Sequence, residues 1–186
     1  MRRRAYLAGP DVFLPYAMAH AARKAAICDR YGIEACPPLN EDVASLEAMT
    51  AEEAWSGIYR KDIAMMEACD FAIANLTPFR GVSADSGTLV EIGWFLGRGR
   101  PVFGYSNSAE EFAPRCHRHL GVLPDPLPGI TVEGFGLPDN LMIQGALMQS
   151  GGHPMLTPKA GEDLPFDSLE LFESCVALAA RSLGEI

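Results

Sequence analysis

The sequence lacks any apolar run long enough to cross a membrane. Its apolar runs, such as Phe71-Ala-Ile-Ala74, fall far short of the roughly 20 residues that a transmembrane helix needs. Three arginines follow Met1, but the apolar stretch after them is broken at Gly9-Pro10-Asp11. No cleavable signal segment is therefore visible, and no membrane association is expected.

Paired cysteines are also lacking. The five cysteines are an odd number, are widely spaced and form no CxxC pair, which is typical of reduced thiols in a cytoplasmic protein. Cys116 lies beside His117 and His119, but no further cluster of ligand-type residues completes a metal site around them. We therefore expect a cytoplasmic protein that uses no metal.

Positive charge is scarce. Fifteen Lys and Arg residues stand against 24 Asp and Glu residues, so the net charge is −9. Such a surface repels phosphate backbones, which argues against a nucleic acid polymer as partner. A small neutral ligand remains possible. Most of the carboxylates are expected to keep the surface soluble, while a few could act as acid, base or nucleophile in a pocket.

The 186 residues, 48% of them hydrophobic, suit a single folded domain over residues 1–186. Short apolar runs typical of strands alternate with segments of helical spacing. The strands are expected at 5–8, 33–36, 71–75 and 101–105, and the helices at 16–31, 50–68 and 85–95. This alternation predicts an α/β fold, a doubly wound parallel sheet flanked by helices on both faces.

The pattern changes after residue 107. Residues 108–139 are rich in proline, glycine and charge, and are expected to form a long connection. Helices are expected again at 141–149 and 168–183, and an irregular stretch at 39–49. In parallel sheets, ligands bind beyond the carboxyl ends of the strands, which here means 9–13, 75–85 and the residues after Tyr105.

The segment Asp85-Ser-Gly-Thr-Leu-Val-Glu91-Ile-Gly93 holds the strongest candidates for chemistry. Asp85 is suited to cap a helix, and Gly87 allows a ligand to approach the backbone. Glu91 stands among apolar neighbours within two turns of the helix start. It is either a solvated residue on the helix face or a carboxylate held in a pocket, where it could attack an electrophilic carbon.

Three further residues have two interpretations each. Asp70 follows a predicted helix, where the macrodipole disfavours an acidic side chain, so it either has a role or merely marks a boundary. Tyr6 in the first strand is either a core aromatic or a hydroxyl that orients a carboxylate. Asn140 either caps a helix or offers its amide to a sugar hydroxyl.

Together these motifs resemble the nucleoside 2-deoxyribosyltransferase family. The matching pieces are Tyr6-Leu-Ala-Gly-Pro10, the helix end with Asp62, Met66 and Asp70, the Asp85–Gly93 segment, and Asn140-Leu-Met142. The resemblance covers about residues 4–150. Residues 151–186 form a C-terminal helical extension that it does not explain.

The resemblance implies a flavodoxin-like fold and a function in nucleotide salvage without a cofactor. Glu91 would be the nucleophile that holds 2-deoxyribose as a covalent ester, oriented by Tyr6, while Asp70 would protonate the departing base. The substrate-binding residues would be Gly9, Asp85, Gly87, Asn140 and Met142. The last two would serve the site of a neighbouring subunit in a homo-oligomer.

The resemblance implies small-molecule partners, namely deoxynucleosides and free nucleobases. A nucleoside or nucleotide N-glycosidase of the same fold, which transfers the sugar to water, is the nearest alternative. A phosphoribohydrolase fits less well, because residues 80–85 lack its Pro-Gly-Gly-x-Gly run. A non-catalytic nucleoside-binding module is a third possibility. Residues facing the base are expected in 11–15 and 39–56, where Trp55 could stack.

Overall fold

A computed structural model describes residues 2–39, 49–122, 129–159 and 161–184. Its centre is a four-stranded sheet made of β1 (Arg4–Ala8), β2 (Glu34–Cys36), β3 (Phe71–Asn75) and β4 (Val102–Tyr105). All neighbouring strands are parallel and their order is β2-β1-β3-β4. This is the beginning of the flavodoxin-like order, and Leu156 continues it with a parallel bridge to Tyr105 at the outer side of β4.

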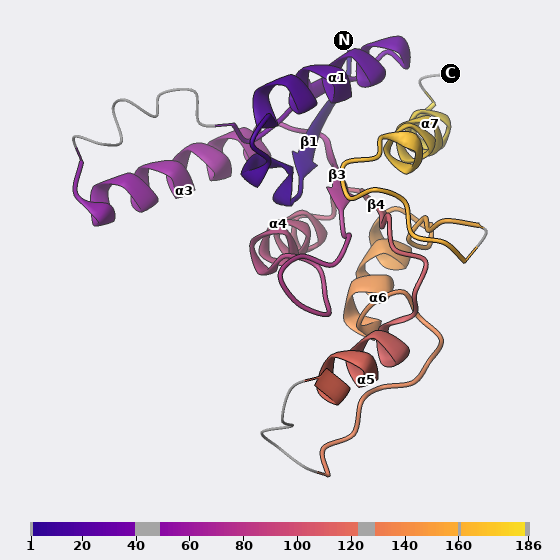
Figure 1. The fold of residues 1–186 in the computed structure, drawn as a ribbon. Helices are drawn as coiled ribbons and strands as arrows, with labels where there is room; N and C mark the ends of the chain where they lie inside the picture. The colour runs from indigo at the N-terminus through magenta and orange to yellow at the C-terminus, as the bar shows by residue number, and fades with distance from the viewer. Residues whose placement is uncertain (1, 40–48, 123–128, 160, 185–186) are drawn as a thin grey trace.

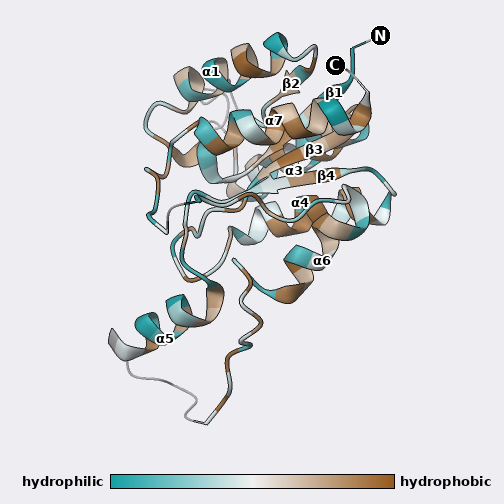
Figure 2. Cartoon of the chain, turned by 90° about the vertical axis from the view of Figure 1, so that its right-hand side faces the viewer, coloured by the Kyte–Doolittle hydropathy of each residue, from teal (hydrophilic) through white to brown (hydrophobic). Residues whose placement is uncertain are grey.

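Helices cover both faces of the sheet. The described residues form the helices α1 (Ala17–Arg30), α3 (Ala51–Glu67), α4 (Ser86–Gly97), α5 (Phe112–Val122), α6 (Leu141–Ser150) and α7 (Glu170–Leu183), with a 3₁₀ turn η1 at Pro10–Phe13. Helices α1 and α7 pack together on one face, and α4 and α6 on the other (Figures 1 and 2). None of the helices in the described ranges is both long and apolar enough to span a membrane.

Burial explains why these residues form this sheet. Every residue of β3 is buried, as expected for a strand covered on both faces. The two hydrophobic cores lie on opposite faces, one containing Phe95 of α4 and Leu147 of α6, the other Ile27 of α1 and Phe172 of α7. The predicted doubly wound α/β fold is therefore confirmed.

The main correction concerns residues 108–139, where the sequence predicted only a long connection. Helix α5 lies within this stretch. Pro114 falls in its first turn, where a missing backbone N–H costs nothing, so the proline does not interrupt the helix. Residues 40–48 of the predicted irregular stretch lie outside the described residues.

Helix α3 projects from the body of the molecule (Figure 1). It begins at the predicted capping box, in which Thr50 and Glu53 satisfy each other's backbone N–H groups. Its other end is held by Arg100, whose guanidinium donates to the carbonyl oxygens of Met66, Glu67 and Cys69 at 2.8, 3.0 and 2.7 Å. The helix is thus anchored near the sheet and exposes the ring of Trp55 farther out.

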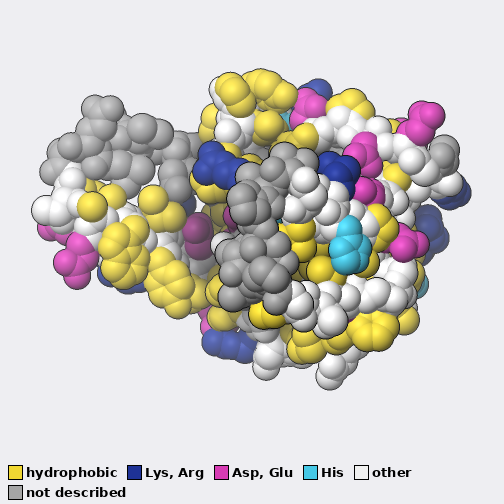
Figure 3. Space-filling model, turned by 60° about the horizontal axis from the view of Figure 1, so that its bottom comes forward, with side chains coloured by type: hydrophobic (Ala, Val, Ile, Leu, Met, Phe, Trp, Pro, Cys, Tyr) yellow, Lys and Arg dark blue, Asp and Glu magenta, His cyan; other side chains and the backbone are white. Residues whose placement is uncertain are grey.

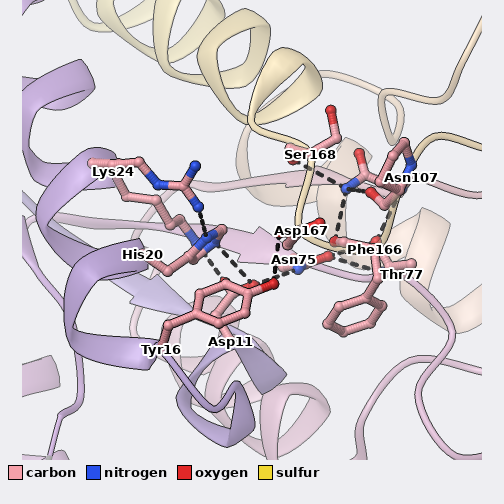
Figure 4. A network of polar contacts seen from close by, with 12 residues as sticks. Asp11, Tyr16, His20, Lys24, Asn75, Thr77, Asn107, Phe166, Asp167 and Ser168 are labelled. Atoms are coloured by element: carbon pink, nitrogen blue, oxygen red, sulfur yellow. Dashed lines mark hydrogen bonds and ion pairs between the residues drawn. The ribbon is translucent and has the colours of Figure 1, made fainter.

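A polar network fixes the loops at the carboxyl edge of the sheet (Figure 4). The buried ammonium of Lys24 lies 2.6 Å from Asp11 Oδ2, and Asn75 Nδ2 donates to Asp11 Oδ1 at 2.9 Å. Asn107 donates its amide N–H groups to three carbonyls of the segment before α7 (Pro165, Phe166 and Ser168). These bonds tie η1 and the C-terminal region to the ends of β3 and β4.

Candidate active site

A hydrogen bond between the sheet and α4 forms the centre of the site. Tyr6, a fully buried residue of β1, donates its hydroxyl to Glu91 Oε1 at 2.5 Å. Glu91 is positioned by the start of its helix, where Asp85 accepts hydrogen bonds from the backbone N–H and hydroxyl of Thr88 at 3.0 and 3.2 Å. The structure thus contains a hydrogen bond between the hydroxyl of Tyr6 and the carboxylate of Glu91.

Glu91 opens onto a cavity of about 420 Å³ between α3 and α4. The cavity is lined by Trp55, Ile58, Tyr59, Asp62, Ile63, Met66, Gly87, Val90, Glu91 and Trp94. Its walls are mostly apolar and aromatic, and its two carboxyl groups are those of Asp62 and Glu91. Figure 3 shows hydrophobic side chains gathered on the projecting part of the molecule that carries α3. Size and lining suit a small, flat, mostly neutral molecule.

The electrostatic setting of Glu91 is unusual for a carboxylate. Burial raises its pKa from 4.5 to about 7, and the nearby charges of Asp62 and Asp85 act in the same direction. The hydrogen bond from Tyr6 opposes this shift because it stabilises the ionised form. Burial and the Glu91 charge also raise the pKa of Tyr6, so its hydroxyl remains a donor. Glu91 is therefore poised to change charge near neutral pH.

Asp62 of α3 is the second carboxyl group of the cavity. Burial raises its pKa, and its Oδ1 atom is buried without a hydrogen-bond partner among the described residues. A buried polar atom without a partner costs free energy, so this oxygen is a candidate to contact a ligand. Sequence reasoning placed Asp62 in a motif but gave it no role. A signal was available, since Asp62 interrupts a helical stripe of Trp55, Tyr59 and Met66.

Asp70, the expected acid, lies elsewhere. It precedes β3, and its Oδ2 accepts a hydrogen bond from the backbone N–H of Arg4, the first residue of β1, at 2.8 Å. These are the amino ends of the strands, whereas ligands of parallel sheets bind at the carboxyl ends. Asp70 neither lines the cavity nor figures among the charges that shift the pKa of Glu91. The structure therefore does not bring Asp70 into the site.

The structure gives different reasons for glycine at the two predicted positions. Gly87 lines the cavity, and a Cβ there would meet only Asp85 Oδ2, at 3.1 Å. Gly9 has a φ of +148°, and a Cβ there would come within 2.8 Å of Asn75 Cβ. The absence of a side chain at position 9 is thus explained by the close approach of β3, independently of any ligand.

Asn140 and Met142 lie outside the cavity that contains Glu91 of the same chain. Asn140 caps α6, because its Oδ1 accepts from the backbone N–H of Met142 at 3.0 Å, and its Nδ2 donates to Glu133 at 3.1 Å. The side chain of Met142 is 71% exposed. Within the part of the chain that the structure describes, no group of three His, Cys, Asp or Glu side chains could hold a metal ion.

The raised pKa of Glu91 leads to a prediction about stability. A carboxyl group whose pKa is 4.5 when exposed and about 7 when folded binds its proton more tightly in the folded state. Its contribution to stability is present below pH 4.5 and is lost as the pH rises through 7. Between pH 5 and 8 this loss amounts to roughly 2–3 kcal/mol.

Glu91→Gln should remove this loss, so the variant should gain stability relative to the wild type as the pH rises from 5 to 8 in urea unfolding. Glu173→Gln is the control. Hydrogen bonding to Arg30 lowers the pKa of Glu173 below 4.5, so this carboxyl stays ionised over the whole range, and the stability of Glu173→Gln relative to the wild type should hardly change between pH 5 and 8. A stability difference for Glu91→Gln that does not vary with pH would contradict the prediction.

Comparisons with known proteins identify the family. A family model described as nucleoside 2-deoxyribosyltransferase matches residues 5–142. The solved structure of a 2-desoxiribosyltransferase from Leishmania mexicana aligns with a TM-score of 0.64 at 29% identity, covering 96% of this chain and 97% of that one.

Two other proteins are similar over most of their length. A conserved protein from Enterococcus faecalis V583 aligns with a TM-score of 0.55 at 20% identity, covering 95% of this chain and 98% of that one, and shows the fold alone. An uncharacterised protein of Schizosaccharomyces pombe is 27% identical over 165 residues, which is 79% of this chain and 78% of that protein. Because the family model spans well over half of the residues, the chain belongs to the nucleoside 2-deoxyribosyltransferase family of transferases.

Proposed function

We propose that this protein exchanges the nucleobase of 2′-deoxynucleosides by way of a covalent ester on Glu91. The observation that carries the proposal is the desolvated Glu91 carboxylate, held at 2.5 Å by Tyr6 and facing an aromatic cavity. A fixed, poorly solvated carboxylate is suited to attack a carbon that develops positive charge. Breaking an N-glycosidic bond creates such a carbon at C1′.

The reaction takes place in two half-reactions. In the first, a Glu91 oxygen bonds to C1′ while the C1′–N bond breaks, and the base leaves with the electron pair and takes a proton from Asp62. In the second, a nitrogen of the incoming base bonds to C1′, the ester C1′–O bond breaks, and Asp62 recovers a proton from that base. Retaining glycosidases divide the work between two carboxyl groups in the same way.

The surroundings of the two carboxyl groups support this division of roles. Tyr6 donates to Glu91 and so favours its ionised, nucleophilic form. Asp62 has no such donor at Oδ1, and burial raises its pKa, which favours the protonated form that an acid needs. The Asp62 charge raises the pKa of Glu91, so a single proton shared by the two carboxyl groups is favoured over two charges, and the hydrogen bond from Tyr6 is the contact that favours leaving the charge on Glu91.

The walls of the cavity support an unphosphorylated deoxynucleoside as substrate. Trp55, Tyr59 and Trp94 offer flat rings on which a base can stack. Neither Lys nor Arg occurs among the described residues that line the cavity, so nothing there neutralises a 5′-phosphate. The partners we propose are deoxynucleosides and free nucleobases in nucleotide salvage, and the free cysteines are consistent with a cytoplasmic location.

A second subunit is proposed to complete the site. Trp55, Tyr59 and Val90 line the cavity yet are 61%, 58% and 70% exposed, so its outer wall is open in the single chain. Exposed apolar surface of this kind favours a protein interface. Asn140 and Met142 lie outside the cavity of their own chain, which supports the proposal that they contact substrate in the site of a neighbouring subunit.

Base exchange tests the proposal directly. A 2′-deoxynucleoside incubated with a different free base should yield the exchanged deoxynucleoside, and Glu91→Gln should reduce the rate by about 10³-fold or more, since it removes the nucleophile. Without acceptor, intact-protein mass spectrometry should show a 2-deoxyribosyl adduct on the wild type and none on the variant. Free sugar released at an equal rate without acceptor would contradict transfer and indicate hydrolysis.

Asp62 and Asp70 provide a matched pair for the acid. Asp62→Asn should slow exchange by about 10²-fold or more, because the leaving base is no longer protonated. Asp70→Asn, which changes a carboxylate at the opposite edge of the sheet, should stay within about threefold of the wild type, as expected for a group outside the site. For donors whose base leaves readily without a proton, Asp62→Asn should reduce the exchange rate less. A greater loss for Asp70→Asn would contradict the assignment.

A further inference from the structure

A buried carboxylate outside the cavity connects the start of α4 with the start of α6. Asp139 is 1% exposed. Its Oδ1 accepts from the hydroxyl of Ser83 at 2.6 Å and from the backbone N–H of Asn140 at 2.8 Å, and its Oδ2 accepts from the backbone N–H of Ala84 at 3.0 Å. The proposed reaction assigns no task to this residue.

Arg115 of α5 completes the cluster. Its Nη2 atom lies 3.8 Å from Asp139 Oδ2, and its side chain is almost fully buried. The guanidinium also donates to the carbonyl oxygens of Val82, Glu110 and Pro138 at 2.6, 2.7 and 2.8 Å. Asp139 and Arg115 therefore hold the residues before α4 from two sides.

The position of this cluster in the chain gives it a consequence for the site. Ser83 and Ala84 directly precede Asp85, the N-cap of α4, and Glu91 follows on the same helix. A buried charge that loses a donor is costly, so the loop cannot shift without uncovering the Asp139 carboxylate. Because a helix moves as a rigid body, the position of the N-terminus of α4 sets the position of Glu91 relative to Tyr6.

We propose that Asp139 is a positioning residue for base exchange. It holds the N-terminus of α4 in place and thereby orients Glu91 toward C1′. This inference rests on the proposed function. Displacements of about 1 Å are enough to slow an enzymatic reaction by about 10²-fold, so fixing the entrance of this helix has a catalytic effect. The same carboxylate also fixes the backbone of Asn140, the other end of the shared site.

The chain contains a natural control for this arrangement. Asp163 accepts hydrogen bonds from the hydroxyl of Ser108 at 3.0 Å and from the backbone N–H of Ala109 at 2.7 Å, the same Ser-Ala donor pair that Asp139 uses. Its donors follow β4, and no proposed site residue lies beside them. Ser83→Ala and Ser108→Ala therefore remove the same kind of bond, one at the entrance of α4 and one away from it.

The test measures kcat and KM for base exchange in purified full-length variants that are folded at the assay temperature. Ser83→Ala should lower kcat by about tenfold, because Glu91 is less well aimed, and should change KM by less than about threefold. Ser83→Thr, which restores a hydroxyl, should recover most of the loss. Ser108→Ala should keep the kcat of the wild type, and Asp139→Asn should lose more than Ser83→Ala.

Each outcome has a defined meaning. Wild-type kcat in Ser83→Ala would overturn the inference, as would an equal loss in Ser108→Ala or a failure of Ser83→Thr to recover activity. If the wild type exchanges bases in those cases, the proposed function stands and only the role of Asp139 is overturned. A wild type that exchanges no base on any deoxynucleoside would overturn the proposed function and this inference with it.

Discussion

The hydrogen bond from Tyr6 to Glu91 is the contact on which the account of this protein depends. It joins an inner strand of the sheet to the helix that carries the carboxylate, at 2.5 Å and in a partly buried position. Burial makes the charged form of Glu91 costly, whereas the phenol donor makes it attainable near neutral pH. The architecture around this bond supplies both conditions, because β1 is buried on both faces and α4 is fixed at its first turn.

The clusters around Asp11 and around Asp139 differ from the proposed site in their hydrogen bonding, because the carboxylate oxygens of both clusters have partners within the protein. Asp11, Lys24 and Asn75 satisfy one another and hold the loops at the carboxyl edge (Figure 4), and Asp139 is surrounded by donors in the same way. Hydrogen-bonded groups of this kind make a structure rigid, and their paired atoms are not available to bind a ligand. Within the cavity, Asp62 retains a buried oxygen without a partner among the described residues, as does Asn107 Oδ1 in the network of Figure 4, and only the Asp62 oxygen lies beside Glu91, where we propose that the substrate binds.

Much of the fold could be predicted from sequence because its signals are local. The apolar run of β3, the capping box at Thr50 and the N-cap at Asp85 each act over a few residues, and the structure confirms all three. Glu91 and Tyr6 could be proposed as partners, but the helical stripe that contains Asp62 could not by itself decide between Asp62 and Asp70, because that choice depends on which edge of the sheet each carboxylate reaches. Helix α5 was missed since its proline and charges resemble those of a loop.

The pKa of Glu91 is the most direct test of this account. Carbon-13 NMR titration of the Glu91 carboxyl, assigned by comparison with Glu91→Gln, should give a pKa near 7 in the wild type and a higher value in Tyr6→Phe, which lacks the stabilising donor. Tyr16→Phe is the control, because it removes a tyrosine–carboxylate bond to Asp167 away from the cavity and should leave the pKa of Glu91 unchanged. A wild-type pKa near the ordinary 4.5, or no rise in Tyr6→Phe, would contradict the account.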